Sequence, residues 1–439
     1  MFLKNPFYTS HFQIIYIGLI CFCVPGMYNS LNSMGGGGQL DTTTGSNANT
    51  ALYATFTIFG LFSGCIINLL GVRFTIFSAS ITYALYTCSF VYYNNTKLPA
   101  PTIIAGCLLG IGAAVLWAGQ GMMMTSYPLE HEKGKFIFIF WGIYNMGGVL
   151  GSIIPTVINS DKDLSNSGYI AFTSVQVFGA IMSLFLCPPT SVIRSDGSNL
   201  IISKQDNVIG EVIQILKLFT KPSTIALFFL SLPSNYFYSL FFNVYNGANF
   251  TTRSKGFNNI FYWASEILGS YITSLILDSK LGRKKRAYYG TSFVVLLFNT
   301  LLVSMIFQLN KFNSYKSSGN FPLDFQKSSS SIYSGALILY IFLGIASASW
   351  QTLAYWLIGS YSNDSTVLSR YVGFFKGVQS AGSAISWAVD AANAKPIIQL
   401  VLVMAFFNLA VPFMYYICYK TTETNELTKS DVKDGHLSV

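Results

Sequence analysis

Two charged residues lie inside long apolar stretches of the sequence, where an ionisable side chain could carry a proton or hold an ion. Glu266 stands within residues 257–277 and Lys376 within 371–390. A charge in lipid is costly and is usually retained for function. Glu266 is therefore a candidate proton or cation site, with Lys376 as a counter-charge or an anion contact. A structural pair, or a Lys376 side chain that reaches the membrane interface, is the alternative.

Uncharged polar and aromatic residues in other apolar stretches form a second candidate set. Tyr28 and Asn29 follow Pro25, and Asn235 and Tyr236 follow Pro233. Helices that are interrupted at corresponding positions of two repeats indicate a binding site. The expected substrate cavity comprises Tyr28, Asn29, Trp117, Gln120, Asn145, Asn235, Tyr236, Gln351 and Gln379. Hydrogen bonding between helices is the alternative role for each of them.

Other kinds of chemistry have little support. The seven cysteines form no CxxC pair and the three histidines lie far apart, so we expect no metal, no cofactor and no enzyme activity. No GK[ST] follows Gly35–Gly38, which favours a flexible turn over a phosphate loop. The net charge of +9 is scattered over short segments, which argues against nucleic acid as a partner.

Long apolar stretches must position these residues. The chain has 439 residues, 52% of them hydrophobic and 10% charged, a composition that suits lipid rather than water. Each crossing helix needs roughly 20 apolar residues. The sequence predicts an all-α membrane protein with twelve spans: 12–31, 49–70, 74–93, 102–123, 136–157, 169–187, 222–245, 257–277, 287–308, 332–355, 371–390 and 397–418.

The basic residues predict the orientation of these spans. Of the 26 Lys and Arg, seventeen fall on the side of the N-terminus, eight fall on the other side, and Lys376 lies within a span. Because cytoplasmic loops carry the basic excess, we expect both termini in the cytoplasm. The plasma membrane is the default location, with an internal membrane as the alternative. The sequons at Asn94 and Asn249 would then lie outside as glycosylation candidates.

The spans repeat as two sets of six. Similar residues recur in the same order at offsets of roughly 210 and 235 positions, and parallel six-span repeats are a known transporter plan. We expect an N-terminal half (1–187), a cytoplasmic linker (188–221), a C-terminal half (222–418) and a cytoplasmic tail (419–439). Within the linker, 208–219 has helical apolar spacing that fits an inner-leaflet helix or a plain linker helix.

Short polar motifs follow the second span of each half. They contain Asn68, Gly71 and Arg73 in the first half, and Asp278, Gly282 and Arg283 in the second. The second motif resembles the loop motif of the major facilitator superfamily, in which an acid and an arginine join neighbouring helix ends. The resemblance implies cytoplasmic gating loops. Here Asp278 and Gly282 stand one residue further apart than in that pattern, and Asn68 replaces the acid.

Three segments carry a closer resemblance, to the uncoordinated-ninety-three-like branch of that superfamily. They are PGMYNSLNSMGGGG (25–38), LLGIGAAVLWAGQGMMMTSYP (108–128) and RYVGFFKGVQSAGSAISWAVD (370–390). The first member of the branch is an ion channel regulatory protein. The resemblance covers most of 11–418 and implies the major facilitator fold.

These observations predict a secondary transporter that moves a small solute by alternating access, with protons as the proposed coupling ion. Its partners would be the solute and membrane lipid. The alternative is a non-transporting regulator that binds an ion channel or another membrane protein.

Overall fold

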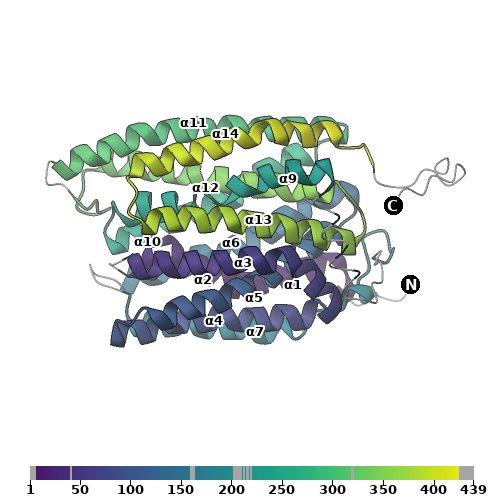
Figure 1. Cartoon of the computed structure of the whole chain (residues 1–439), viewed down its shortest axis with the longest axis horizontal. Coiled ribbons are helices and arrows are strands. Elements are labelled where there is room, and N and C mark those ends of the chain that lie inside the picture. Colours follow the sequence, from purple (N-terminus) through teal and green to yellow (C-terminus); the bar gives the residue numbers. More distant parts are fainter. Residues whose placement is uncertain are drawn as a thin grey trace, which may run out of the picture.

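A computed structural model describes residues 6–39, 42–158, 164–200, 210, 213, 217, 220–317 and 321–424. Within these ranges the chain forms thirteen α-helices and only isolated β-bridges. The long helices run along one common axis, and the start of α1 and the end of α14 lie at the same end of the bundle (Figure 1). We call this the terminal end and the other the opposite end.

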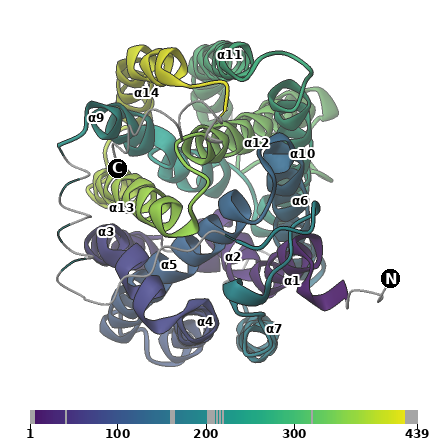
Figure 2. The ribbon, with the colours of Figure 1, turned by 90° about the vertical axis from the view of Figure 1, so that its right-hand side faces the viewer.

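The helices form two groups. The N-terminal group contains α1 (Ser10–Cys21), α2 (Met27–Ser33), α3 (Thr43–Leu70), α4 (Val72–Thr96), α5 (Ala100–Ser126), α6 (Lys133–Ile158) and α7 (Asn166–Ser183). The C-terminal group contains α9 (Pro222–Ser231), α10 (Thr252–Leu277), α11 (Arg283–Ser317), α12 (Ser330–Gly359), α13 (Ser365–Ala391) and α14 (Pro396–Lys420). Figure 2 shows the two groups side by side in a view along the bundle, with α6 against α10.

Both helices that contain the expected prolines are interrupted, in two different ways. A π-helical turn, Phe22–Gly26, contains Pro25 and joins α1 to α2 as one continuous rod. Near Pro233 the helix tightens into a 3₁₀ turn and then leaves helical geometry at Asn235 (φ −132°, ψ 4°). Proline removes a backbone donor and clashes with the preceding turn, which accounts for both interruptions.

The outer surface of the bundle is apolar. Leu296, Phe307 and Val157 are 70%, 65% and 76% exposed, as expected for side chains that face lipid. Among the described residues, nine helical segments are long and apolar enough to cross a membrane. Helices α7, α9 and α13 are not among them, although they lie alongside the others in Figure 1. Helix α13 carries Arg370, Lys376 and Asp390, which lowers its hydropathy.

Two seams join the groups, α3 with α13 and α6 with α10. Glycines bring the backbones of the first seam together: a Cβ on Gly60 would lie 2.7 Å from Gly377 Cα, and one on Gly373 would lie 3.0 Å from Gly60 O. In the second seam a Cβ on Gly148 would lie 2.6 Å from the Trp263 ring. Small residues allow such close packing between helices in lipid.

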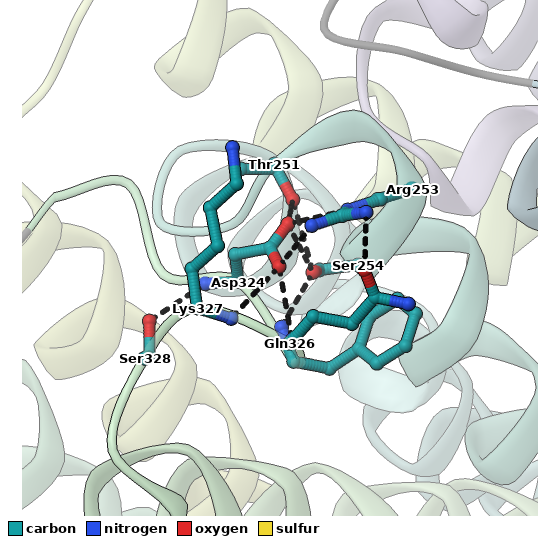
Figure 3. A network of polar contacts seen from close by, with 8 residues as sticks. Thr251, Arg253, Ser254, Asp324, Gln326, Lys327 and Ser328 are labelled. Atoms are coloured by element: carbon teal, nitrogen blue, oxygen red, sulfur yellow. Dashed lines mark hydrogen bonds and ion pairs between the residues drawn. The ribbon is translucent and has the colours of Figure 1, made fainter.

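A polar network holds the loop before α12 to the start of α10 (Figure 3). Asp324 accepts hydrogen bonds from Arg253 Nε (2.7 Å) and Nη2 (2.5 Å) and from Thr251 Oγ1 (2.6 Å). The backbone N–H groups of Gln326 and Lys327 donate to the same carboxylate at 2.9 and 3.2 Å. Although burial opposes it, hydrogen bonding by Arg253 and Thr251 lowers the pKa of Asp324 below the usual aspartate range.

Both predicted glycosylation sites are engaged in hydrogen bonds. Asn249 is buried, and its side-chain amide donates to the carbonyl groups of Val244 and Tyr245 at 2.7 and 2.9 Å. A glycan on Asn249 would require these two hydrogen bonds to break, and both glycosylation sites stay predictions. Asn94 is half-buried and donates to Leu164 O at 2.9 Å. Most of the predicted linker helix, 208–219, and the tail after 424 lie outside the described residues.

Candidate functional site

A polar cavity lies between the two helix groups. The empty space between its walls is about 550 Å³, a figure that includes space open to solvent. Its walls are formed by Tyr28, Asn29, Leu52, Tyr53, Phe56, Tyr83, Leu109, Ala113, Trp117, Trp141, Tyr144, Asn235, Tyr238, Gln351, Lys376, Gln379 and Ser380. Both groups therefore contribute to a single site, and seven residues singled out from the sequence are in its wall.

Hydrogen bonds connect three amide side chains on the side of the cavity that the C-terminal group forms. Gln379 Nε2 donates to Ser234 Oγ (2.7 Å) and to Gln351 Oε1 (3.2 Å). Gln351 Nε2 donates in turn to Asn235 Oδ1 (2.9 Å) and to the carbonyl oxygen of Ser234 (3.0 Å). That carbonyl is available because the helix unwinds after Pro233. The interruption thus supplies backbone polarity to the cavity wall.

Lys376 occupies an aromatic cage in this wall. Its side chain is 4% exposed, and its ammonium group donates to Gln379 Oε1 at 2.7 Å. The nitrogen lies 4.8 Å from the centre of the Trp117 ring, 5.1 Å from that of Tyr355 and 5.2 Å from that of Phe375. Aromatic faces at this range attract a cation. Among the described side chains, Lys376 forms no ion pair with Glu266 or with any other acid.

Hydroxyl and amide groups order the N-terminal side of the cavity. The Tyr28 hydroxyl donates to Asn49 Oδ1 at 3.0 Å, and Asn29 Nδ2 donates to the Tyr144 hydroxyl. Trp117 Nε1 donates to the Tyr83 hydroxyl at 3.1 Å. These bonds fix the rings and the amide that face the cavity.

Glu266 lies behind the wall rather than in it. It is 2% exposed, and Tyr144 and Tyr238, which line the cavity, lie within its electrostatic reach. The polar groups around its carboxyl belong to Asn145, Tyr262 and Ser347. Among the described residues, these groups surround Glu266 Oε1 without a hydrogen bond of regular distance and angle. Glu266 therefore does not line the central cavity, and its role as a proton or cation site stays a prediction.

Three predicted wall residues lie elsewhere. Gln120 is fully buried and donates to Met124 Sδ at 3.5 Å within its own helix. Asn145 faces Glu266, and Tyr236 packs against Phe406 of α14 with ring centres 4.8 Å apart. Tyr238 takes the wall position, because the backbone leaves helical geometry between Pro233 and this residue. The density of aromatic residues was the only sequence signal for Tyr238, Trp141 and Tyr144.

Contacts between the groups close the terminal end. Lys133 at the start of α6 is buried and donates to the carbonyl oxygens of Gly359 and Ser362, beyond the end of α12. Asp278, after α10, accepts a hydrogen bond from the backbone N–H of Gly134 at 3.1 Å. Burial raises the pKa of Asp278, partly offset by the backbone N–H groups of Gly134 and Lys135. The start of a helix carries partial positive charge, which favours this carboxylate.

A second set of contacts closes the opposite end. Asp390 of α13 accepts hydrogen bonds from Asn243 Nδ2 (2.6 Å) and from Ser46 Oγ of α3 (3.0 Å). Trp263 Nε1 of α10 donates to Ser33 Oγ of α2 at 3.1 Å. The contacts of Asp390 with Ser46 and of Trp263 with Ser33 join the two groups. The contact of Asp390 with Asn243 lies within the C-terminal group and holds the aspartate in place. Contacts that join the two groups therefore lie toward both ends of the bundle, with the cavity between them.

The Gly35–Gly38 turn lies beside the opposite-end contacts. All four glycines have positive φ, and a Cβ on Gly37 would lie 2.5 Å from the Phe90 ring. The Tyr169 hydroxyl donates to Gly37 O at 2.7 Å. The expected flexible turn is therefore a buried, closely packed one, and only glycine fits its backbone.

The sequence matches the family model described as "Ion channel regulatory protein UNC-93" over residues 36–415. The chain belongs to the UNC-93 family. It is 40% identical to UNC93-like protein 1 of Arabidopsis thaliana over 417 residues, which cover 93% of this chain and 89% of that protein. It is 36% identical to an UNC93-like protein of Schizosaccharomyces pombe over 388 residues, with 87% and 76% covered. The family description and these names denote no enzyme.

Solved structures with a similar fold are membrane transporters. The proton:xylose symporter XylE superposes with a TM-score of 0.64 at 13% identity, covering 97% of each chain. The fucose:proton symporter FucP of E. coli superposes with a TM-score of 0.60 at 12% identity, covering 93% of this chain and 98% of that one. The UNC-93 chain therefore has the major facilitator fold and is a multi-pass integral membrane protein.

The two loop motifs of this UNC-93 chain differ in what they contact. In the first, Asn68 Oδ1 accepts from Ser369 Oγ of α13 at 3.3 Å, and Arg73 Nε donates to Leu186 O at 2.8 Å. Gly71 (φ 82°) allows the turn between α3 and α4. Arg73 thus stays within the N-terminal group, where Asn68 supplies no charge to pair with it.

In the second motif, Asp278 contacts the N-terminal group. Arg283 and Arg286 instead make contacts within the C-terminal part of the chain. Arg286 Nη1 donates to Leu277 O at 2.8 Å. The backbone N–H of Arg283 donates to Glu423 Oε2 at 2.6 Å, and a Cβ on Gly282 would lie 3.1 Å from the same carboxylate. Glu423, which sequence analysis missed, therefore caps the start of α11. Its position 140 residues away gave no local signal.

Proposed function

We propose that this chain crosses the membrane twelve times, as two six-helix halves (1–187 and 222–418) joined by the linker 188–221. This count takes α1 and α2 as one crossing, and α9 with the interrupted segment to Gly247 as another. Alternation of helix direction then gives an even number of crossings with both ends of the chain on one side. The basic residues favour the cytoplasm for that side, including the tail 419–439. The plasma membrane remains the default location.

We propose that the protein is a secondary transporter that moves a small solute by alternating access. One observation carries this proposal: a polar cavity lies between the two helix groups, and contacts that join the groups lie toward both ends of the bundle. Breaking one set of contacts at a time would expose the cavity to one side and then to the other. Lys133 and Asp278 serve the terminal end in this scheme, and Asp390 serves the opposite end.

We further propose that Glu266 couples transport to protons. Its carboxyl lies at the α6–α10 seam, beside Asn145 of the other group and Ser347 of α12. A carboxyl with unbonded polar neighbours can bind or lose a proton when the seam rearranges, since water then reaches it. A fully bonded structural carboxylate would lack this freedom.

Uptake into proteoliposomes tests the proposal. Purified protein would be reconstituted and supplied with a panel of radiolabelled sugars, amides and carboxylates, with and without an inward proton gradient. We expect gradient-driven uptake of some solute, which Glu266→Gln should abolish while uncoupled exchange persists. The matched control is Glu132→Gln, which changes a carboxylate that accepts only from Ser195 in the described structure. Gradient-driven uptake by Glu266→Gln at the normal rate would remove this residue from coupling.

The family description favours a second candidate function, regulation of an ion channel. A regulator would bind a membrane protein stably through its lipid-facing helices and would not need the cavity to open. Gentle solubilisation followed by mass spectrometry of co-purified proteins tests this. A stoichiometric membrane-protein partner, together with an absence of solute flux, would favour regulation over transport.

A further inference from the structure

The central cavity has an unbalanced charge. Eight of its seventeen wall residues are aromatic and four are amides, whereas the sole charged member of this wall is Lys376. Asp390 stands 14 positions further along α13, about 20 Å at 1.5 Å per residue. Glu266 is buried and is not a member of this wall. No described acid therefore neutralises the ammonium group inside the cavity.

Two hydrogen-bonding groups in the wall have donors that no described residue accepts. One N–H of Lys376 donates to Gln379, and the described residues offer no acceptor to the other two. Trp141 has a buried indole N–H that donates to no described group. Its ring stacks on Trp117 with centres 6.3 Å apart and lies at the same distance from Tyr355. Trp141 therefore adjoins two of the three rings that surround the lysine nitrogen.

We propose that the cavity binds a small organic anion, with its carboxylate on Lys376 and the indole N–H of Trp141. A carboxylate would balance the buried charge and accept from the free donors. The surrounding rings and amides would hold a planar, hydrogen-bonding body. This inference rests on the proposed function only in treating the cavity as the place where a solute binds.

The fixed arrangement of Gln379 explains why the lysine stays directed into the cavity. Ser234 and Gln351 accept from the amide nitrogen of Gln379, so its oxygen must face Lys376. An amide oriented in this way accepts one ammonium N–H and leaves the others for a ligand. A lysine reaching toward lipid headgroups would instead be exposed, but Lys376 is buried.

Matched acid and amide ligands test the proposal. Binding of 4-hydroxybenzoate, nicotinate and lactate to the purified protein in nanodiscs would be compared with that of 4-hydroxybenzamide, nicotinamide and lactamide, by calorimetry and tryptophan fluorescence. We expect at least one acid to bind ten-fold or more tightly than its amide. Lys376→Gln should remove that preference, Lys376→Arg should retain part of it, and Trp141→Phe should weaken acid binding several-fold.

Two controls separate charge at the site from folding. Lys255→Gln removes another buried lysine that lies outside the cavity wall and should leave the preference unchanged. Each variant must elute as a monodisperse protein. If folded wild-type protein binds no acid more tightly than its amide, or if Lys376→Gln retains the preference, the inference is wrong.

The transport assay distinguishes failure of this inference from failure of transport. Uptake of a neutral sugar or amide without binding of acids would preserve the transporter and overturn the anion site. Acid binding that depends on Lys376, without uptake of any panel member, would support the anion site and overturn transport.

Discussion

Two aspartates outside the spans, Asp324 and Asp278, tie loops to the start of a helix in contrasting ways. Asp324 accepts from an arginine, a threonine and two backbone N–H groups, all within the C-terminal group. Asp278 accepts a backbone hydrogen bond from Gly134 in the other group. Their pKa values accordingly move apart, lowered for Asp324 by its hydrogen bonds and raised for Asp278 by burial.

The contrast indicates two different tasks. A carboxylate with many charge-assisted bonds inside one group suits a permanent attachment. A buried carboxylate that meets a helix start across the groups suits a contact that forms and breaks. We therefore expect changes at Asp324 to alter stability, and changes at Asp278 to alter how often the terminal end opens.

The largest effect should follow Asp324→Ala. It leaves the Arg253 guanidinium without its partner and frees the loop before α12, so we expect a loss of about 3 kcal/mol of stability. Thermal unfolding of the purified protein, followed by size-exclusion chromatography, measures this. Asp196→Ala, at an exposed aspartate of the linker, should change the unfolding temperature far less. Equal stability of the two variants would contradict the permanent attachment.

A smaller and more specific effect should follow Gly134→Ala. The new Cβ would lie 2.4 Å from Asp278 Oδ1, so the carboxylate must leave the helix start. Loss of such an interaction, about 1 kcal/mol, should favour opening of the terminal end roughly five-fold. The readout is the rate at which a membrane-impermeant thiol reagent labels Ser380→Cys in the cavity wall from the terminal side, with Cys88 and Cys107 replaced by Ser.

Gly142→Ala provides the matched control, since its Cβ would meet nothing nearer than Ile267 Cγ2 at 3.8 Å. Both substitutions replace a glycine of α6, and only the one at Gly134 places a new Cβ against Asp278. Equal labelling in the two variants would show that the Asp278 contact does not hold the terminal end closed.

The smallest effect should be a pair of opposite pH dependences. Because the pKa of Asp324 is lowered in the folded state, its contribution to stability is complete above the usual aspartate range and declines as pH falls below that range. Because the pKa of Asp278 is raised in the folded state, its effect on stability has the opposite sign. The folded state becomes more stable as pH falls from neutral toward the usual aspartate range. Difference curves against Asp324→Asn and Asp278→Asn, from thermal unfolding at each pH, measure the two trends. Trends of the same sign would contradict this comparison.

The apolar runs in the sequence predicted where the helices lie, but they did not predict the residues at which each helix begins and ends. The predicted span 287–308 lies inside α11, Arg283–Ser317, because the helix continues through charged residues that lipid-based reasoning excludes. Pro25 and Pro233 correctly marked both interruptions, since proline acts locally. How each helix continues beyond its proline depends on packing, which the sequence does not display.

Site residues were predictable where helical geometry persists. Tyr28, Gln351 and Gln379 lie in regular helices and reach the cavity wall. Tyr236 does not, because the broken backbone after Pro233 redirects it and brings Tyr238 into the wall. Glu266 was identified correctly as a buried charge, but its position outside the cavity wall depends on helix rotation. Lys133 and Glu423 were missed as contact residues because their partners are distant in sequence.

The glycine seam between α3 and α13 has a mechanical consequence. Gly60, Gly373 and Gly377 bring the two backbones close, and the side chains of Leu61 and Ser63 of α3 pack against the glycines of α13. Under the proposed function, this seam would keep α3 and α13 close together while the two helix groups move relative to each other. We expect larger side chains there to force α3 and α13 apart, because the nearest atoms are those of the facing backbone.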